Sequence, residues 1–381
     1  MKYAFFLLPF FFSAGLPAQS EPCSCRTALH ETWTALQELP AFRDHCLDGN
    51  CADRYADLTS QADPGISQPH CYRLLTELVA TLHDGHTAIY GSTSDSLGAG
   101  AQEKRIAPTG DFGAGERYFA GPYEFSLEPD DGPEGLVLRM VKSPKPYWRK
   151  GDTLAYLDPL GNYRFRYTGY LPGDGRLVTY QEQIRNGQFH QLGLQRDTAE
   201  VIHARYAGDR TYAYARVAPG LDYVRLGSFN SFQPTLGRAE AFYDTLSDQL
   251  TGQHLIVDLR DNPGGGVRNS NIVYKILRRH RRHYARIFVL INHGTTSNAE
   301  QFALRLKRWS TVVTAGEASK GILAYELEGK SVSVGCDRYV LRMATKRHRR
   351  YLPYEGSGVP ADIELLRDRG WLEQLREWIT D

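Results

Sequence analysis

The stretch His254-Leu-Ile-Val-Asp-Leu-Arg-Asp-Asn-Pro-Gly-Gly-Gly266 joins a short apolar run to three consecutive glycines. A continuous apolar run of this length is typical of a strand that is buried on both faces of a sheet. Glycines directly after such a strand let the backbone approach a ligand and point N–H groups at it, although a plain tight turn uses them too. The Lys-Ser/Thr pair of a Walker phosphate loop is absent. The stretch therefore predicts a buried strand that ends in a glycine-rich loop.

Strands and helices alternate on both sides of this stretch. The residues predict strands at 221–226, 287–291 and 311–314, and helices at 236–250, 269–279 and 297–309. Alternation of this kind, with continuous apolar strands, favours an α/β fold in which helices cover a parallel or mixed sheet. In such sheets, functional sites lie outside the carboxyl ends of the strands.

A second loop at a predicted strand end reads Asn292-His-Gly-Thr-Thr-Ser-Asn-Ala299. Ser297 begins the next predicted helix, and Glu300 follows three residues later, so the pair fits a capping box. A serine at this place can also be a nucleophile whose oxyanion is stabilised by backbone N–H groups and by the positive helix end. The order of strands and helices brings this loop beside the glycine loop. The residues alone leave both interpretations of Ser297 open.

The rest of the chain divides into regions of different character. Apolar residues recur at helical spacing from Cys23 to about Tyr90, and short apolar runs separated by Gly, Asp and Pro between 118 and 217 predict strands. We therefore predict a signal peptide at 1–19, a Cys-rich helical region at 20–95, a β-rich insert with a leading loop at 96–217, and the α/β core at 218–381.

Charge and composition exclude some classes of protein. The 381 residues contain 45 Lys and Arg against 44 Asp and Glu, which gives a formal charge of +1, and 41% of them are hydrophobic. These values suit a globular protein and argue against nucleic-acid binding through a global basic field. We expect no nucleic-acid partner.

The N-terminus has the pattern of an export signal. Lys2 precedes an apolar run from Ala4 to Phe12, and small residues follow between Ser13 and Ser20. The run is shorter than the roughly 20 apolar residues of a membrane span, although a buried helix is an alternative. We expect an exported protein, periplasmic or extracellular, without stable membrane insertion.

Export permits disulfides, and five of the six cysteines lie in the N-terminal quarter of the chain. This clustering predicts a stapled N-terminal module, but six cysteines allow 15 pairings and the sequence does not choose among them. Cys46 follows a histidine, as does Cys71, which keeps a zinc site open as the competing interpretation.

Five motifs together resemble a known family: LHDGHT (82–87), DLRDNPGGG (258–266), VLINHGTTSNAEQFA (289–303), TVVTAGEASKG (311–321) and EGSGVPAD (355–362). In this order they resemble the tail-specific or C-terminal-processing serine peptidases, whose superfamily includes the tricorn core protease and the retinoid-binding proteins of the eye. The resemblance implies a crotonase-like protease core of mixed α/β class, with an insert that is a degenerate PDZ-like domain.

The resemblance also implies roles for single residues. Ser297 falls on the nucleophile, and the N–H groups of Asn298 and of Gly264 or Gly265 fall on the oxyanion hole. Processing peptidases use a Lys base, but Ile322 stands at that position here and Lys320 lies before Gly321. Lys320 is therefore only an alternative base.

A histidine base fits better, because imidazole titrates near neutrality and accepts a proton without a large pKa shift. His86 lies in the segment where the tricorn-like branch has its base, although that branch has a Ser before the histidine and this chain has Gly85. Glu355 falls where the branch has its Glu, which would orient the imidazole. A structural histidine and a surface carboxylate on a turn are the alternatives for these two residues.

We therefore predict an exported serine endopeptidase that acts on peptides or proteins through Ser297, His86 and Glu355, without metal or cofactor. The alternative is an inactive protein of the same fold that binds a peptide or an apolar ligand. The sequence does not predict the substrate or the oligomeric state.

Overall fold

The computed structural model describes residues 23–92, 115–130, 135–196 and 203–380. The predicted signal peptide lies outside these residues, as does most of the predicted leading loop of the insert. Within them, no helix combines the length and the apolar character that are needed to cross a bilayer.

A six-stranded mixed sheet forms the core. Its strands lie in the order β16 (Ile363–Glu364), β13 (Val312–Gly316), β12 (Arg286–Ile291), β11 (His254–Asp258), β10 (Leu221–Leu226) and β9 (Tyr212–Ala218). The first five are parallel, and β9 pairs antiparallel with β10. The predicted α/β class with a mixed sheet is confirmed, and four of these strands lie where the apolar runs predict them.

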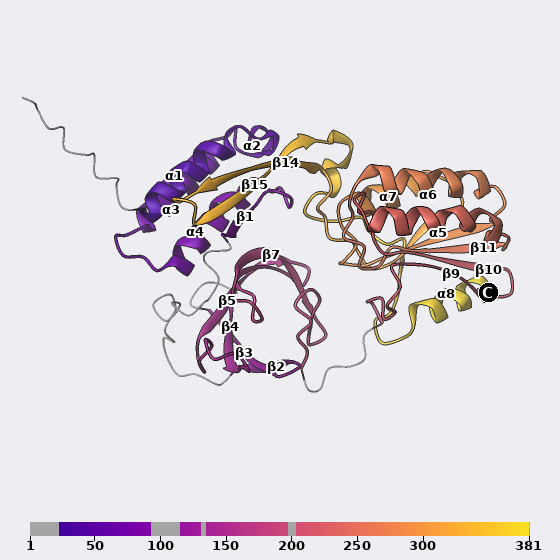
Figure 1. The fold of residues 1–381 in the computed structure, drawn as a ribbon, viewed down its shortest axis with the longest axis horizontal. Helices are drawn as coiled ribbons and strands as arrows, with labels where there is room; N and C mark the ends of the chain where they lie inside the picture. Colours follow the sequence, from indigo (N-terminus) through magenta and orange to yellow (C-terminus); the bar gives the residue numbers. More distant parts are fainter. Residues whose placement is uncertain (1–22, 93–114, 131–134, 197–202, 381) are drawn as a thin grey trace, which may run out of the picture.

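Helices cover both faces of this sheet. Figure 1 shows α5 (Thr235–Gln249), α6 (Val267–His280) and α7 (Asn298–Leu306) on one face and α8 (Trp371–Thr380) on the other. Alternate strand residues enter two separate apolar clusters, and the cluster against Trp371 contains Ile256 and Phe288. Because both faces are covered, successive residues of one strand are all buried, which explains the continuous apolar runs.

The insert is an antiparallel sheet of seven strands in sequence order (Figure 1). They are β2 (Glu116–Ala120), β3 (Tyr123–Pro129), β4 (Leu136–Lys142), β5 (Thr153–Gly161), β6 (Arg164–Tyr170), β7 (Leu177–Arg185) and β8 (Gln188–Phe189). Gln195 forms bridges to Phe119 and Gln188, which links the two edges. Residues 115–130 and 135–196 contain no helix, and the relation of the insert to PDZ domains stays a prediction.

The N-terminal module combines segments from both ends of the chain. Its helices are α1 (Cys25–Leu36), α2 (Pro40–His45), α3 (Asn50–Gln61) and α4 (Gln68–Ala80). They lie beside an antiparallel sheet of β1 (Ala88–Gly91), β15 (Tyr339–Arg347) and β14 (Tyr325–Val334) (Figure 1). A hairpin from the predicted core segment therefore belongs in space to the N-terminal module. A 3₁₀ helix, η3 (Arg349–Tyr354), follows β15.

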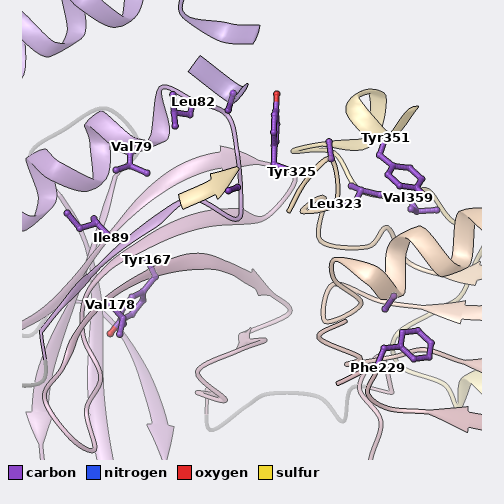
Figure 2. Close-up of a cluster of buried hydrophobic side chains, with 14 of the residues drawn as sticks. Val79, Leu82, Ile89, Tyr167, Val178, Phe229, Leu323, Tyr325, Tyr351 and Val359 are labelled. Carbon is purple, nitrogen blue, oxygen red and sulfur yellow. The ribbon is translucent and has the colours of Figure 1, made fainter. Parts of the chain in front are cut away.

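One apolar cluster connects the three parts. In Figure 2, Val79 of α4 and Tyr167 and Val178 of the insert lie in the same buried cluster as Leu323 and Tyr325. The segment that follows α4, which contains His86, is therefore held against the core by shared packing rather than by a single contact.

Three disulfides complete the module: Cys23–Cys336, Cys25–Cys71 and Cys46–Cys51. The predicted stapling of the N-terminal region is confirmed, and Cys336 extends it to the hairpin of β14 and β15. Because all six cysteines are paired, none is available as a thiolate ligand, and the alternative of a cysteine zinc site is wrong.

Candidate active site

The two loops predicted to lie together do so. The glycine loop follows β11 and the serine loop follows the neighbouring strand β12, so both lie at the carboxyl edge of the sheet. The Thr296 N–H donates to the Asn262 carbonyl at 2.9 Å. Gly264 has φ of +85°, and a Cβ on it would lie 2.8 Å from the Cβ of Ser297. Only glycine fits this contact, because any side chain would collide with the serine turn.

Ser297 occupies a strained turn at the start of α7. It is the N-cap residue, with φ of 58° and ψ of −123°, a conformation that non-glycine residues rarely adopt. Its N–H donates to Glu300 Oε2 at 2.8 Å, so the capping interpretation of Glu300 is correct. Backbone strain of this kind concentrates at functional sites, where it fixes the direction of a side chain.

His86 reaches the serine from the N-terminal module. Its Nε2 lies 2.9 Å from Ser297 Oγ, although 211 residues separate the two in sequence. Asp84 fixes the loop, because its Oδ1 accepts the N–H groups of His86 at 2.8 Å and Thr87 at 3.3 Å. The distance lies within the range that a nucleophile and its base require.

The environment keeps the imidazole neutral. Burial lowers the pKa of His86 to about 4, and the charge that opposes this effect is Glu326. The other ring nitrogen, Nδ1, is buried and has no hydrogen-bond partner among the described residues. Nothing therefore fixes the tautomer in the way that the carboxylate of a Ser-His-Asp triad does.

Glu355 contacts the His86 loop rather than the imidazole ring. Its Oε1 accepts the Gly85 N–H at 3.0 Å, and its Oε2 accepts the N–H groups of Leu323 at 2.8 Å and Ala324 at 2.6 Å. The expected direct bond to the imidazole is absent, and the carboxylate is half-buried rather than exposed on a turn. Burial raises the pKa of Glu355 to about 7, against the effect of the three N–H groups.

The alternative base lies elsewhere. Lys320 is buried, and its backbone N–H donates to the Thr295 carbonyl at 3.1 Å. Burial lowers the pKa of its ammonium group to about 8, while Glu182 and Glu300 oppose this effect. The side chain that contacts Ser297 Oγ is His86 and not Lys320.

Gly85 and Ile322, the two residues that depart from the pattern the resemblance implies, lie next to each other. A Cβ on Gly85 would lie 2.5 Å from Cγ1 of Ile322, so Ile322 fills the space that a serine at position 85 would need. The resemblance implies a Lys base at the position of Ile322.

The contacts of the glycine loop reduce the number of candidate N–H donors for the oxyanion hole. The Gly264 N–H donates to Asn262 Oδ1 at 2.8 Å, so this group is already engaged. Gly265 has φ of +128°, and a Cβ on it would lie 2.3 Å from the backbone of Phe229. Gly265 and Asn298 are the donors that we retain from the sequence-based prediction.

A cavity of about 480 Å³ borders the same loops. Both neighbours of His86 line it, together with Glu355 and an apolar wall that includes Val79 and Ile322. A mostly apolar cavity of this size can hold a side chain or a small ligand. In the described part of the chain, no group of three or more His, Cys, Asp or Glu residues can hold a metal ion.

The sequence matches no family model and no curated protein. Solved structures do resemble the chain in fold. Several of these neighbours are peptidases of the tail-specific type, and another is a lipoprotein from Streptococcus agalactiae. The photosystem II D1 C-terminal processing protease is 18% identical with a TM-score of 0.41, covering 90% of this chain and 93% of that one. Mature CPAF is 13% identical with a TM-score of 0.47 and coverages of 93% and 96%. The tricorn protease is 13% identical with a TM-score of 0.44, covering 94% of this chain and 36% of that one.

Sequence reasoning missed three carboxylates at this site. Asp84 is the D of the LHDGHT motif, and the motif itself was the available signal for it. The sequence indicates Glu300 only as a capping residue. Glu326, which favours protonation of His86, lies on β14 and gave no signal, because nothing in the sequence shows that this strand packs near the histidine.

Proposed function

We propose that this protein is an exported serine peptidase that cleaves peptides or proteins through an acyl-enzyme on Ser297. The observation that carries the proposal is the 2.9 Å contact between Ser297 Oγ and His86 Nε2, made at the positive end of α7 beside a glycine loop. A nucleophile, a neutral base and backbone donors at one helix end are the minimum set for acyl transfer.

In the proposed reaction, Ser297 Oγ attacks the carbonyl carbon of the scissile bond and gives its proton to His86 Nε2. The negative charge on the carbonyl oxygen is stabilised by the N–H groups of Gly265 and Asn298. His86 then donates the proton to the leaving amine as the C–N bond breaks. In the second half of the reaction, His86 accepts a proton from a water molecule, and the water oxygen attacks the ester carbon. Ser297 Oγ then leaves and takes the proton back from His86 as the acyl C–O bond breaks. Glu355 acts through the backbone of Gly85 and keeps the base in place.

An inactive binding protein of the same fold is the second candidate. Two observations favour it: His86 Nδ1 has no hydrogen-bond partner among the described residues, and a mostly apolar cavity of about 480 Å³ borders the site. A dyad without an orienting carboxylate still catalyses, because the nucleophile and base remain in contact. The two candidates differ in whether Ser297 reacts.

A fluorophosphonate probe separates these candidates. We expect it to label the wild-type protein at Ser297, because the reaction needs an activated serine and an oxyanion site. Ser297→Ala should not be labelled, and Ser331→Ala, which removes an exposed serine on β14, should be labelled normally. Peptide mapping by mass spectrometry locates the adduct. A folded wild-type protein that stays unlabelled would favour the binding protein.

Export is part of the proposal, and the disulfides and the N-terminal pattern support it. We expect the mature protein to lack residues 1 to about 19 and to contain three disulfides. Intact mass before and after reduction checks both points. Reduction should lower the free energy of unfolding by roughly 2–5 kcal/mol for each disulfide that is lost. Finding Met1 or six free thiols on exported protein would contradict the proposal.

A further inference from the structure

Glu300 lies in the first turn of α7 and is fully buried, with 0% of its surface exposed. Four donors converge on its carboxylate. Oε2 accepts the N–H groups of Ser297 at 2.8 Å and Ile322 at 3.0 Å. Oε1 accepts the Ser319 hydroxyl at 2.6 Å and the Gly321 N–H at 2.7 Å. A capping box needs only the first of these contacts.

The arrangement requires the ionised carboxylate. Four donors can be satisfied only by a group that accepts at both oxygens and donates at neither. A protonated acid or an amide would turn a donor toward another donor inside the protein, which is costly. The positive end of α7 favours the negative charge at this place. Burial is the larger effect and raises the pKa of Glu300 above its ordinary value, while the four hydrogen bonds oppose this rise.

These contacts hold the nucleophile and the base at once. The bond to the Ser297 N–H stabilises the turn with positive φ and occupies this N–H. The bond to the Ile322 N–H fixes the residue whose side chain packs against Gly85, next to His86. Through Ser319, whose Oγ also accepts the Val359 N–H at 2.7 Å, the carboxylate reaches the loop that follows Glu355.

We infer that Glu300 is the positioning residue of this site: its buried carboxylate sets the conformation of Ser297 and the distance from Ser297 Oγ to His86 Nε2. The inference rests on the proposed peptidase function for its kinetic consequence, but its geometric consequence does not depend on activity. The residue acts through the Ser297 N–H and does not touch the substrate.

The test compares Glu300→Gln with the wild type. We expect kcat to fall by about 10²-fold with KM changed less than about threefold, because a displacement of about 1 Å at the reacting atoms costs this much. The rate of fluorophosphonate labelling should fall by a similar factor. Glu317→Gln is the matched control, since Glu317 is a buried carboxylate directly after β13 that pairs with Arg367 and does not contact Ser297.

Crystal structures of both proteins provide the second readout. We expect Ser297 to leave positive φ in Glu300→Gln and its Oγ to move out of hydrogen-bond distance of His86. If Glu300→Gln does not fold, Ser319→Ala removes one donor, and we expect it to fold and to lose about three- to tenfold in kcat. A variant with unchanged kcat and unchanged Ser297 geometry overturns the inference. A wild type without activity overturns the proposed function alone, and the crystal structures then decide the inference.

Discussion

Replacing His86 with alanine should lower kcat for peptide hydrolysis by roughly 10²-fold or more, because it removes the group that accepts the proton of Ser297. His86 Nε2 lies 2.9 Å from Ser297 Oγ, and burial lowers the pKa of His86 to about 4, so the ring is a neutral acceptor at pH 7. Steady-state kinetics on a cleaved peptide measure the effect.

Lys320→Met is the matched comparison for this result. Methionine keeps the length of the buried side chain and removes the amine, and we expect less than about a tenfold loss of kcat. Thermal melts show whether each variant is folded. A larger loss in Lys320→Met than in His86→Ala would mean that the amine is the base and that the contact seen between His86 and Ser297 is incidental.

Much of the core could be predicted from the sequence because its determinants are local. The segments 221–226 and 254–259 are rich in apolar residues, and the helix between them has clear periodicity, so alternation predicts the sheet. Whether β14 and β15 belong to the core could not be predicted. β15 pairs with β1 across some 250 residues, and no local pattern records such a partner.

The sequence predicts candidate residues for the site, but not the contacts among them. The resemblance predicts Ser297, His86 and Glu355, and their roles stay a prediction, although the first two lie within hydrogen-bond distance of each other. The directions of individual N–H and carboxylate groups could not be predicted. That the Gly264 N–H points at Asn262, and that Glu355 binds the backbone rather than the imidazole, depends on loop conformations set by tertiary packing.

Glu355→Gln should lower kcat by about 10–10³-fold with little change in KM. The carboxylate joins the His86 loop to the segment of Leu323 and Ala324 by accepting three N–H groups. An amide has one accepting oxygen, so at least one of these bonds is lost and the base is held less firmly. Glu328→Gln, which changes an exposed carboxylate on β14, is the control and should leave kcat unchanged.

The pH dependence of kcat/KM shows whether the charge of Glu355 is what matters. Burial raises the pKa of Glu355 to about 7 and lowers that of His86 to about 4. Both groups must be deprotonated for the proposed roles, so as pH falls activity should first decline near 7, where Glu355 takes up a proton and loses acceptor capacity. In Glu355→Gln this decline should disappear and leave a lower, flat profile that falls only near 4, where His86 becomes charged. A decline near 7 that persists in the folded variant would assign it to another group and would remove the Glu355 charge from the mechanism.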